Sequence, residues 1–283
     1  MDALAALRLQ IAWGADEALD DLPLDRTRPV AAAARRPQVA RAAADPGVAA
    51  APPVRAEVVA PVVAPARVVP VPAGAAALAT PVVQAQAAAA AAGTREALRE
   101  ALAGFAPCPL RDTAGHLVFF DGNPEAGVVL VGEVPGAEED RAGTPFAGPA
   151  GQLLDRMLGS VGLGRTTVAM TMLVPWRPPG GRPPTDGEVA MCLPFLQRHL
   201  VLLRPRVLVP LGALATRAVT GNSLGIRRLR GRVAEAAVPG LEGTAVVLPM
   251  LPPAHLLRTP GAKREAWADL LQLRTLLDGV TKT

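Results

Sequence analysis

Four apolar runs with almost no polar interruption mark the C-terminal two thirds of the chain. They lie at residues 128–131, 167–174, 206–211 and 245–250. Such runs are typical of strands buried on both faces of a sheet. Segments with helical spacing of apolar positions lie between or after them, at residues 151–161, 185–203, 213–219 and 262–277. Strands that alternate with helices favour a parallel sheet covered on both sides. The pattern therefore predicts an α/β fold, a three-layer α/β/α sandwich with a central four-stranded parallel sheet.

The first third of the chain has a different pattern. Residues 3–20 space their apolar positions like one short helix, which Pro23 helps to end. We therefore expect a short helical segment over residues 1–26. Residues 27–92 are rich in Ala, Pro and Val without an amphipathic period, a composition that favours extended, solvated chain. We expect a disordered linker there.

The folded domain is expected to begin after this linker. Thr94 can cap a helix over residues 95–102, whose outer face carries both acids and bases. From there the domain extends over residues 93–283, which is long enough to bury a hydrophobic core.

Composition narrows the function classes only slightly. The formal net charge of +4 over 283 residues permits a polyanionic partner without requiring one. No charge-free apolar stretch of the length of a membrane span occurs, so we expect no membrane partner. Acidic residues follow the apolar N-terminus, which is the wrong flank for a signal peptide, and we expect a cytoplasmic protein. The two cysteines, Cys108 and Cys192, are far apart in sequence and cannot build a disulfide framework.

Most candidate functional residues lie in the loop after the first predicted strand. In open parallel sheets, function gathers at the carboxyl ends of the strands. Here the strand runs into a Gly/Pro turn with Glu133, followed by the acidic pair Glu139 and Asp140 and a single Phe146. Packing alone does not require so much glycine, acid and aromatic in one loop, and the loop is typical of a pocket that holds a flat ring beside a carboxylate. A phosphate cradle is disfavoured because the loop lacks both the G-x-G-x-x-G and the P-loop patterns; a tight turn with surface acids is the simpler alternative.

Basic residues lie near other strand ends. Gly148 to Gly151 place unpaired backbone N–H groups at the start of a predicted helix, which is a typical binding site for an anion. Residues 226–232 contain four arginines, which either form a solvated charged loop or contact phosphate together with Arg258. His255 is either structural or catalytic.

Several motifs together resemble the family-4 uracil-DNA glycosylases. The resemblance covers about residues 95–278 in one order and spacing. It rests on residues 131–158, Cys108-Pro109-Leu110, Trp176-Arg177-Pro178-Pro179, Cys192 to Leu196, Arg228-Leu229-Arg230-Gly231, Ala254 to Arg258, and Lys263 to Trp267. The family has a four-stranded parallel sheet between helices, flips uracil out of DNA and hydrolyses its bond to deoxyribose.

The resemblance implies a role for each matching residue. Glu133 would be the catalytic acid that orients water or faces the sugar cation, Glu139 its supporting acid, and Phe146 the ring that stacks on uracil. Three further residues of the first loop would line the base site: Gly132, Pro135 and Gly136. The remaining positions would contact DNA, with the leucines pressing into the duplex: Gly148, Gly151, Arg228, Arg230, Leu256, Leu257 and Arg258.

Other positions depart from the family pattern. The asparagine that reads the uracil edge is Met172 here, and the histidine that donates to the base oxygen is Pro252. The family also holds a four-iron–four-sulfur cluster on four cysteines. Cys108 and Cys192 match two of them, whereas Phe105 and Trp176 stand at the other two positions. Two thiolates do not satisfy such a cluster, so we expect no metal and no cofactor.

Two hypotheses follow from these residues. The first is a glycosylase of base-excision DNA repair whose excision is impaired or altered. The second is a noncatalytic module, derived from a glycosylase, that binds DNA or a repair partner. In both, the expected partner is single- or double-stranded DNA, the expected state is a monomer, and the N-terminal segment is a candidate site for a protein partner.

Overall fold

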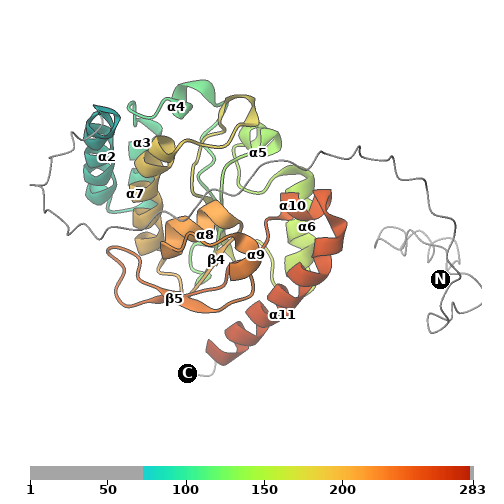
Figure 1. Ribbon diagram of the computed structural model, residues 1–283. Helices are drawn as coiled ribbons and strands as arrows, with labels where there is room; N and C mark the ends of the chain where they lie inside the picture. The colour runs from blue at the N-terminus through green and yellow to red at the C-terminus, as the bar shows by residue number, and fades with distance from the viewer. Residues whose placement is uncertain (1–72, 281–283) are drawn as a thin grey trace, which may run out of the picture. The chain divides into compact units, whose positions relative to one another are not determined.

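A six-stranded sheet forms the centre of the molecule. The computed structural model describes residues 73–280 (Figure 1). The strand order is β1-β3-β2-β4-β6-β5. The strands are β1 (Phe120–Gly122), β2 (Val128–Gly132), β3 (Ala169–Met172), β4 (Val207–Pro210), β5 (Ala234–Ala236) and β6 (Ala245–Val247). The four inner strands are parallel and correspond to the four predicted runs. The prediction of a sheet with only four strands was incomplete, because β1 and β5 add an antiparallel strand at each edge.

Alternating side chains of the inner strands build two separate cores. Val129 and Val131 face one core, whereas Val128 and Leu130 face the other. Every residue of β2 is buried, as expected for a strand covered on both sides. This alternation confirms the predicted three-layer architecture.

Helices cover both faces of the sheet. The first core contains buried residues of α2, α3, α7 and α8, and the second contains residues of α6 and α11. The longer helices are α2 (Ala73–Ala91), α3 (Arg95–Ala103), α6 (Gly148–Gly159), α7 (Asp186–Leu203), α8 (Ala213–Thr220) and α11 (Lys263–Val280). Thr94 caps α3 as predicted, since its Oγ1 accepts a hydrogen bond from the backbone N–H of Ala97 at 3.1 Å.

Short elements connect these layers. They are α4 (Leu110–Thr113), α5 (Ala137–Ala142), α9 (Ile226–Leu229) and α10 (Pro253–Arg258), with single 3-10 turns η1 (Pro179–Gly181) and η2 (Pro260–Ala262). Both α5 and α10 follow the carboxyl end of an inner strand, and α9 lies between β4 and β5 in the chain.

The predicted linker over residues 27–92 extends too far. Its last part forms α2, which packs against α7 and α3 (Figure 1). The small buried side chains of Ala85 and Ala89 allow this close approach, and the guanidinium Nε of Arg198 on α7 donates to the carbonyl of Ala92 at 2.8 Å. The folded unit therefore includes α2 and begins before residue 93. The rest of the expected linker and the expected helix over residues 3–20 lie outside the described residues.

Within the described residues, no helix combines the length and the apolar composition needed to cross a membrane.

Candidate functional site

A cavity opens where the inner strands end. Its volume is about 340 Å³, and its walls come from the loops after β2, β3, β4 and β6. The loop after β2 contributes most of the residues that the sequence predicted. Seven predicted site residues line this one cavity: Gly132, Glu133, Pro135, Gly136, Glu139, Phe146 and Arg258. Strand ends that are distant in sequence meet here because their strands are parallel neighbours.

Glu133 is held by a helix that sequence reasoning did not connect to it. Its Oε1 accepts a hydrogen bond from the backbone N–H of Leu214, near the start of α8, at 2.6 Å. Burial raises the pKa of Glu133 above the usual glutamate value of 4.5, while the backbone N–H groups of Leu214 and Ala215 pull the pKa down. The carboxylate is thus poorly hydrated but fixed in place, which suits a group that must stabilise a nearby positive charge.

Gly212 makes this contact possible. It precedes α8 and has φ = 118°, in a region that favours glycine. A Cβ atom at Gly212 would overlap the Glu133 carboxylate. The sequence showed only a glycine at a strand end, with no signal that an acid packs on it.

Glu139 contributes to the shape of the first loop. Its Oε2 accepts a hydrogen bond from the N–H of Gly136 at 3.0 Å, which ties the loop to the start of α5. The side chain is buried and lines the cavity. This contact suits the predicted supporting role, since Glu139 fixes the loop that carries Glu133.

Phe146 lines the cavity. Phe146 is buried and has φ = 52°, unusual for a residue with a side chain. A Cβ atom at Gly132 would lie 2.9 Å from Phe146 Cζ and would collide with the sulfur of Met172. Gly132 therefore packs against both Phe146 and Met172, and only glycine fits at the end of β2.

Arg165 fixes the Phe146 backbone, a role that no sequence pattern indicated. Its Nη2 donates to the carbonyl of Phe146 at 2.7 Å, and its Nε donates to Asp155 at 2.9 Å. Arg165 also forms an ion pair with Asp121 in the middle of the edge strand β1. These contacts offset the cost of the positive φ of Phe146.

The wall that should read a base edge is apolar. Met172 and Pro252 line the cavity at the two positions where the family has an asparagine and a histidine. Neither side chain can donate a hydrogen bond. His255 is not a lining residue, and its Nε2 is buried without a partner among the described residues.

Two predicted DNA contacts need correction. Leu256 is fully buried in a small core with Leu153 and Leu251, so its side chain does not press into a duplex. Its neighbour Leu257 is 44% exposed, and its contact with DNA stays a prediction. Arg230 is also occupied: two of its guanidinium nitrogens donate to the buried Asp269 at 2.6 and 3.0 Å. It therefore anchors α9 to α11, while Arg228 remains exposed.

Gly148 and Gly151 have structural reasons to be glycine. Gly148 has φ = 68° at the start of α6, and a Cβ atom there would collide with Glu138. A Cβ atom at Gly151 would overlap the carbonyl oxygen of Phe146. Their predicted contact with DNA stays a prediction.

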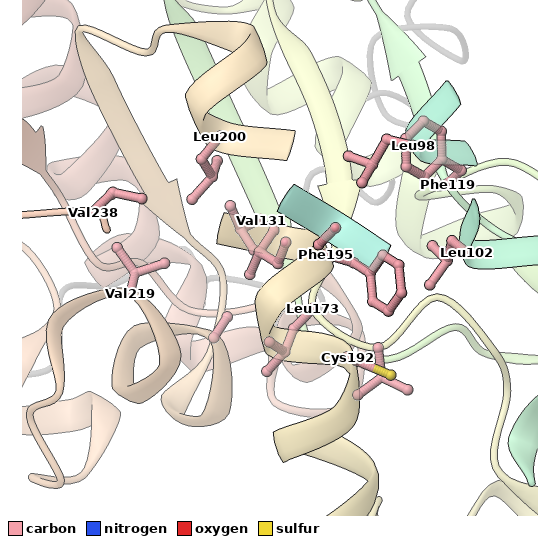
Figure 2. Packing of buried hydrophobic residues seen from close by; sticks show 14 of the residues in the cluster. Leu98, Leu102, Phe119, Val131, Leu173, Cys192, Phe195, Leu200, Val219 and Val238 are labelled. Atoms are coloured by element: carbon pink, nitrogen blue, oxygen red, sulfur yellow. The ribbon is translucent and has the colours of Figure 1, made fainter. Parts of the chain in front are cut away.

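The residues at the family's cluster site do not fit such a cluster. Cys108 and Cys192 are buried, and their thiols hydrogen-bond to each other, which lowers the pKa of Cys108. Phe105 and Trp176 are buried in the same core, and the Phe105 ring meets that of Phe195 at 5.2 Å. Figure 2 shows Cys192 among apolar side chains, including Leu102 and Leu173. Among the described residues, no group of three or more His, Cys, Asp or Glu side chains could hold a metal ion.

The α/β/α sandwich, with a carboxylate, an aromatic ring and exposed arginines around one cavity at its strand ends, belongs to the class of open α/β proteins that carry their site at the carboxyl edge of the sheet. Comparison with known proteins narrows this class. The family model of the uracil DNA glycosylase superfamily matches residues 119–271. The chain belongs to this superfamily and resembles its type-4 members.

Three type-4 uracil-DNA glycosylases illustrate the similarity. The protein from Pyrobaculum aerophilum is 36% identical over 168 residues, covering 58% of this chain and 84% of the relative. The one from Archaeoglobus fulgidus is 37% identical, covering 60% and 86%. The one from Thermotoga maritima is 39% identical, covering 53% and 77%.

Proposed function

We propose that this protein acts in base-excision DNA repair as a DNA N-glycosylase whose excision of uracil is impaired or altered. One observation carries the proposal. Glu133 and Phe146 share one cavity, whereas the positions that would read the base edge are the apolar Met172 and Pro252. The groups that act on the sugar and stack the base are retained, and the groups that identify the base are not.

The retained residues suit hydrolysis of a glycosidic bond. The target nucleotide leaves the base stack and enters the cavity, where stacking on Phe146 offsets part of the unstacking cost. The bond between C1′ and the base nitrogen breaks, and its electron pair leaves with the base. A water oxygen bonds to C1′ and loses a proton to solvent, and the departing base anion takes up a proton in turn. Positive charge develops on the sugar, and the poorly hydrated carboxylate of Glu133 stabilises it.

The apolar wall formed by Met172 and Pro252 weakens stabilisation of the departing base. Negative charge develops on the departing base, and neither Met172 nor Pro252 can donate a hydrogen bond to it. Loss of one such donor typically lowers the rate by about 10²- to 10³-fold. Loss of an amide that pairs with the base edge also lowers discrimination between bases.

A strand-cleavage assay tests this proposal. The protein is incubated with single- and double-stranded DNA that contains one uracil or another altered base, followed by alkali, which cleaves the strand at an abasic site. Slow cleavage that Glu133→Gln abolishes would support it. Cleavage that persists unchanged in Glu133→Gln would contradict the role of Glu133.

The alternative function is a noncatalytic DNA-binding or repair-partner module. The simultaneous apolar replacements at Met172 and Pro252 favour it, since loss of both donors removes more rate than loss of one. In the same assay, intact strands combined with salt-sensitive DNA binding would support this alternative.

We also propose that the protein holds no iron–sulfur cluster. Two thiols remain where four are required, and the bulky side chains of Phe105 and Trp176 occupy the vacated positions. Iron and acid-labile sulfide analysis of protein purified without oxygen tests this. Stoichiometric iron would overturn the proposal.

The remaining expectations are a cytoplasmic monomer that flips its target base, with the N-terminal segment as a candidate contact for a protein partner. Light scattering at micromolar concentration distinguishes a monomer from a dimer. Fluorescence of 2-aminopurine placed beside the target nucleotide reports unstacking on binding.

A further inference from the structure

A second cavity lies at the same end of the sheet and carries two arginines. Its volume is about 310 Å³, close to that of the cavity lined by Glu133 and Phe146, which we call the base cavity. Its lining includes Arg95 and Arg99 from α3, Glu96, Phe120 at the start of β1, and Gly143 at the end of α5. We call it the arginine cavity.

The two guanidinium groups have few partners. Arg99 makes no hydrogen bond or ion pair with the described residues. Arg95 lies over the Phe120 ring, with 4.8 Å between the guanidinium carbon and the ring centroid. Its ion pair with Glu96 is 3.5 Å long, and the Glu96 side chain is 74% exposed, so solvent screens the pair. Cation–π stacking orients Arg95 while its N–H groups remain available at the edge of the plane.

Two connections place the arginine cavity beside the base cavity. Phe120 pairs with Thr171 of β3, and the next residue of β3 is Met172, on the wall of the base cavity. Independently, α5 is flanked by Gly136, which lines the base cavity, and by Gly143, which lines the arginine cavity. This six-residue helix is about 9 Å long at 1.5 Å per residue. Both cavities therefore open near the carboxyl edge of the sheet.

We propose that the arginine cavity binds backbone phosphate of the same DNA strand that places a nucleotide in the base cavity. The inference rests on the proposed function only in that DNA occupies the base cavity. A strand carries one phosphate per roughly 3.4 Å along the helix axis, so about 9 Å corresponds to two or three nucleotides. Arginine is suited to this contact because its planar donors match phosphate oxygens. The site carries no sequence information and sets the register of the strand.

The salt dependence of DNA binding tests the proposal and does not depend on excision activity. The affinity of the full chain for a single-stranded oligonucleotide is measured by anisotropy over a range of salt concentrations. In the double variant Arg95→Gln/Arg99→Gln, the slope of log affinity against log salt should fall in magnitude by about 1.4, or 0.7 for each lost phosphate contact. Glu96→Gln should bind more tightly than the parent, because the acid in the cavity repels phosphate.

A matched control and a set of shortened DNAs locate the contact. Arg274→Gln removes an exposed arginine on α11 that pairs with Asp278, and its slope should equal that of the parent. Oligonucleotides are shortened stepwise from either side of the target nucleotide. The difference in salt slope between the double variant and the parent should vanish once three nucleotides are removed on one side. It should persist when three nucleotides are removed on the other side.

Three results would overturn the proposal. They are an unchanged salt slope in the double variant, a slope difference that is lost equally when the DNA is shortened from either side, and no salt-sensitive binding by the parent. Failure of the proposed function gives a different pattern. A parent protein that binds DNA with the expected slopes but cleaves no altered base would refute the glycosylase and leave the arginine cavity standing.

Discussion

The carboxylate of Glu133 lies 2.6 Å from the backbone nitrogen of Leu214, across 81 positions of the sequence. This contact ties the loop after β2 to the start of α8, which follows β4. The two strands are neighbours in the sheet, so their carboxyl ends bring acid and helix together. The catalytic geometry proposed for Glu133 therefore depends on a residue that carries no functional group, Gly212.

Substitution of Gly212 tests this dependence. Gly212→Ala places a Cβ atom against the Glu133 carboxylate at φ = 118°, which strains the backbone and displaces the acid. We expect at least a tenfold loss of excision rate, roughly the effect of about 1.4 kcal/mol on the barrier. Single-turnover strand cleavage measures it. Gly221→Ala is the control, since that glycine also has positive φ but its Cβ would meet nothing within 4 Å. Equal rate losses in both variants would indicate strain alone.

The raised pKa of Glu133 predicts the acid limb of the pH profile. The ionised carboxylate is the form that stabilises the sugar cation, so the rate should fall as pH drops through a pKa above 4.5. Single-turnover rates between pH 4 and 8 measure this limb, and Glu133→Gln should lack it. An acid limb governed by a pKa at or below 4.5 would contradict the effect of burial on Glu133.

The same shift has a consequence for stability. A pKa that is higher in the folded than in the unfolded chain means that protonation of Glu133 favours folding. This contribution is complete below about pH 4.5 and is lost as pH rises through the folded value. Thermal unfolding should therefore find Glu133→Gln at least as stable as the parent at pH 7.

The pair Arg230–Asp269 should contribute to stability rather than to DNA affinity. The Asp269 side chain is 2% exposed, and removal of its partner leaves a buried charge. We expect Arg230→Ala to lower the free energy of unfolding by about 3–5 kcal/mol, as typical for a broken buried pair. Arg228→Ala, two residues earlier and exposed, should change it by less than about 0.5 kcal/mol. Urea unfolding measures both; similar values would show that Arg230 is not an anchor.

Adjacent leucines on α10 should separate packing from DNA contact. Leu256 is fully buried, and Leu256→Ala should cost about 2–5 kcal/mol of unfolding free energy. Leu257 is 44% exposed, and Leu257→Ala should leave stability nearly unchanged while it slows base extrusion. Urea unfolding and 2-aminopurine fluorescence measure the two effects. Unchanged extrusion in Leu257→Ala would remove this residue from the DNA interface.

Sequence patterns were sufficient for the centre of the fold because buried parallel strands need uninterrupted apolar runs. The edge strands lacked that signal: β1 is half-buried throughout, and β5 has only one buried residue of three. Helix α2 was missed because its Ala-rich sequence contains Pro81 and has no amphipathic period. Packing against α7 stabilises it, and such tertiary contact overrides local propensity.

The candidate site was predictable only where its residues share one loop. Glu133 and Phe146 stood out because glycine, acid and aromatic residues follow one buried strand. The supports that Gly212 and Arg165 provide are contacts between distant segments, and single residues leave no periodic signal. The opposite orientations of Leu256 and Leu257 are set by the placement of α10.

A polar side chain at Met172 should restore part of the base recognition. Met172 lines the cavity together with Phe146, and Met172→Asn places an amide where the resemblance implies the base edge is read. We expect uracil excision to rise at least tenfold relative to other altered bases, because a paired polar edge discriminates by about 1.4 kcal/mol or more. The buried amide should also lower stability by about 1–3 kcal/mol in the free protein.

Met172→Leu, which keeps an apolar wall of similar volume, is the control. The gain should disappear in the double variant with Glu133→Gln, since recognition without the acid does not hydrolyse the bond. If Met172→Asn and Met172→Leu excise uracil equally, the apolar wall is not what limits excision.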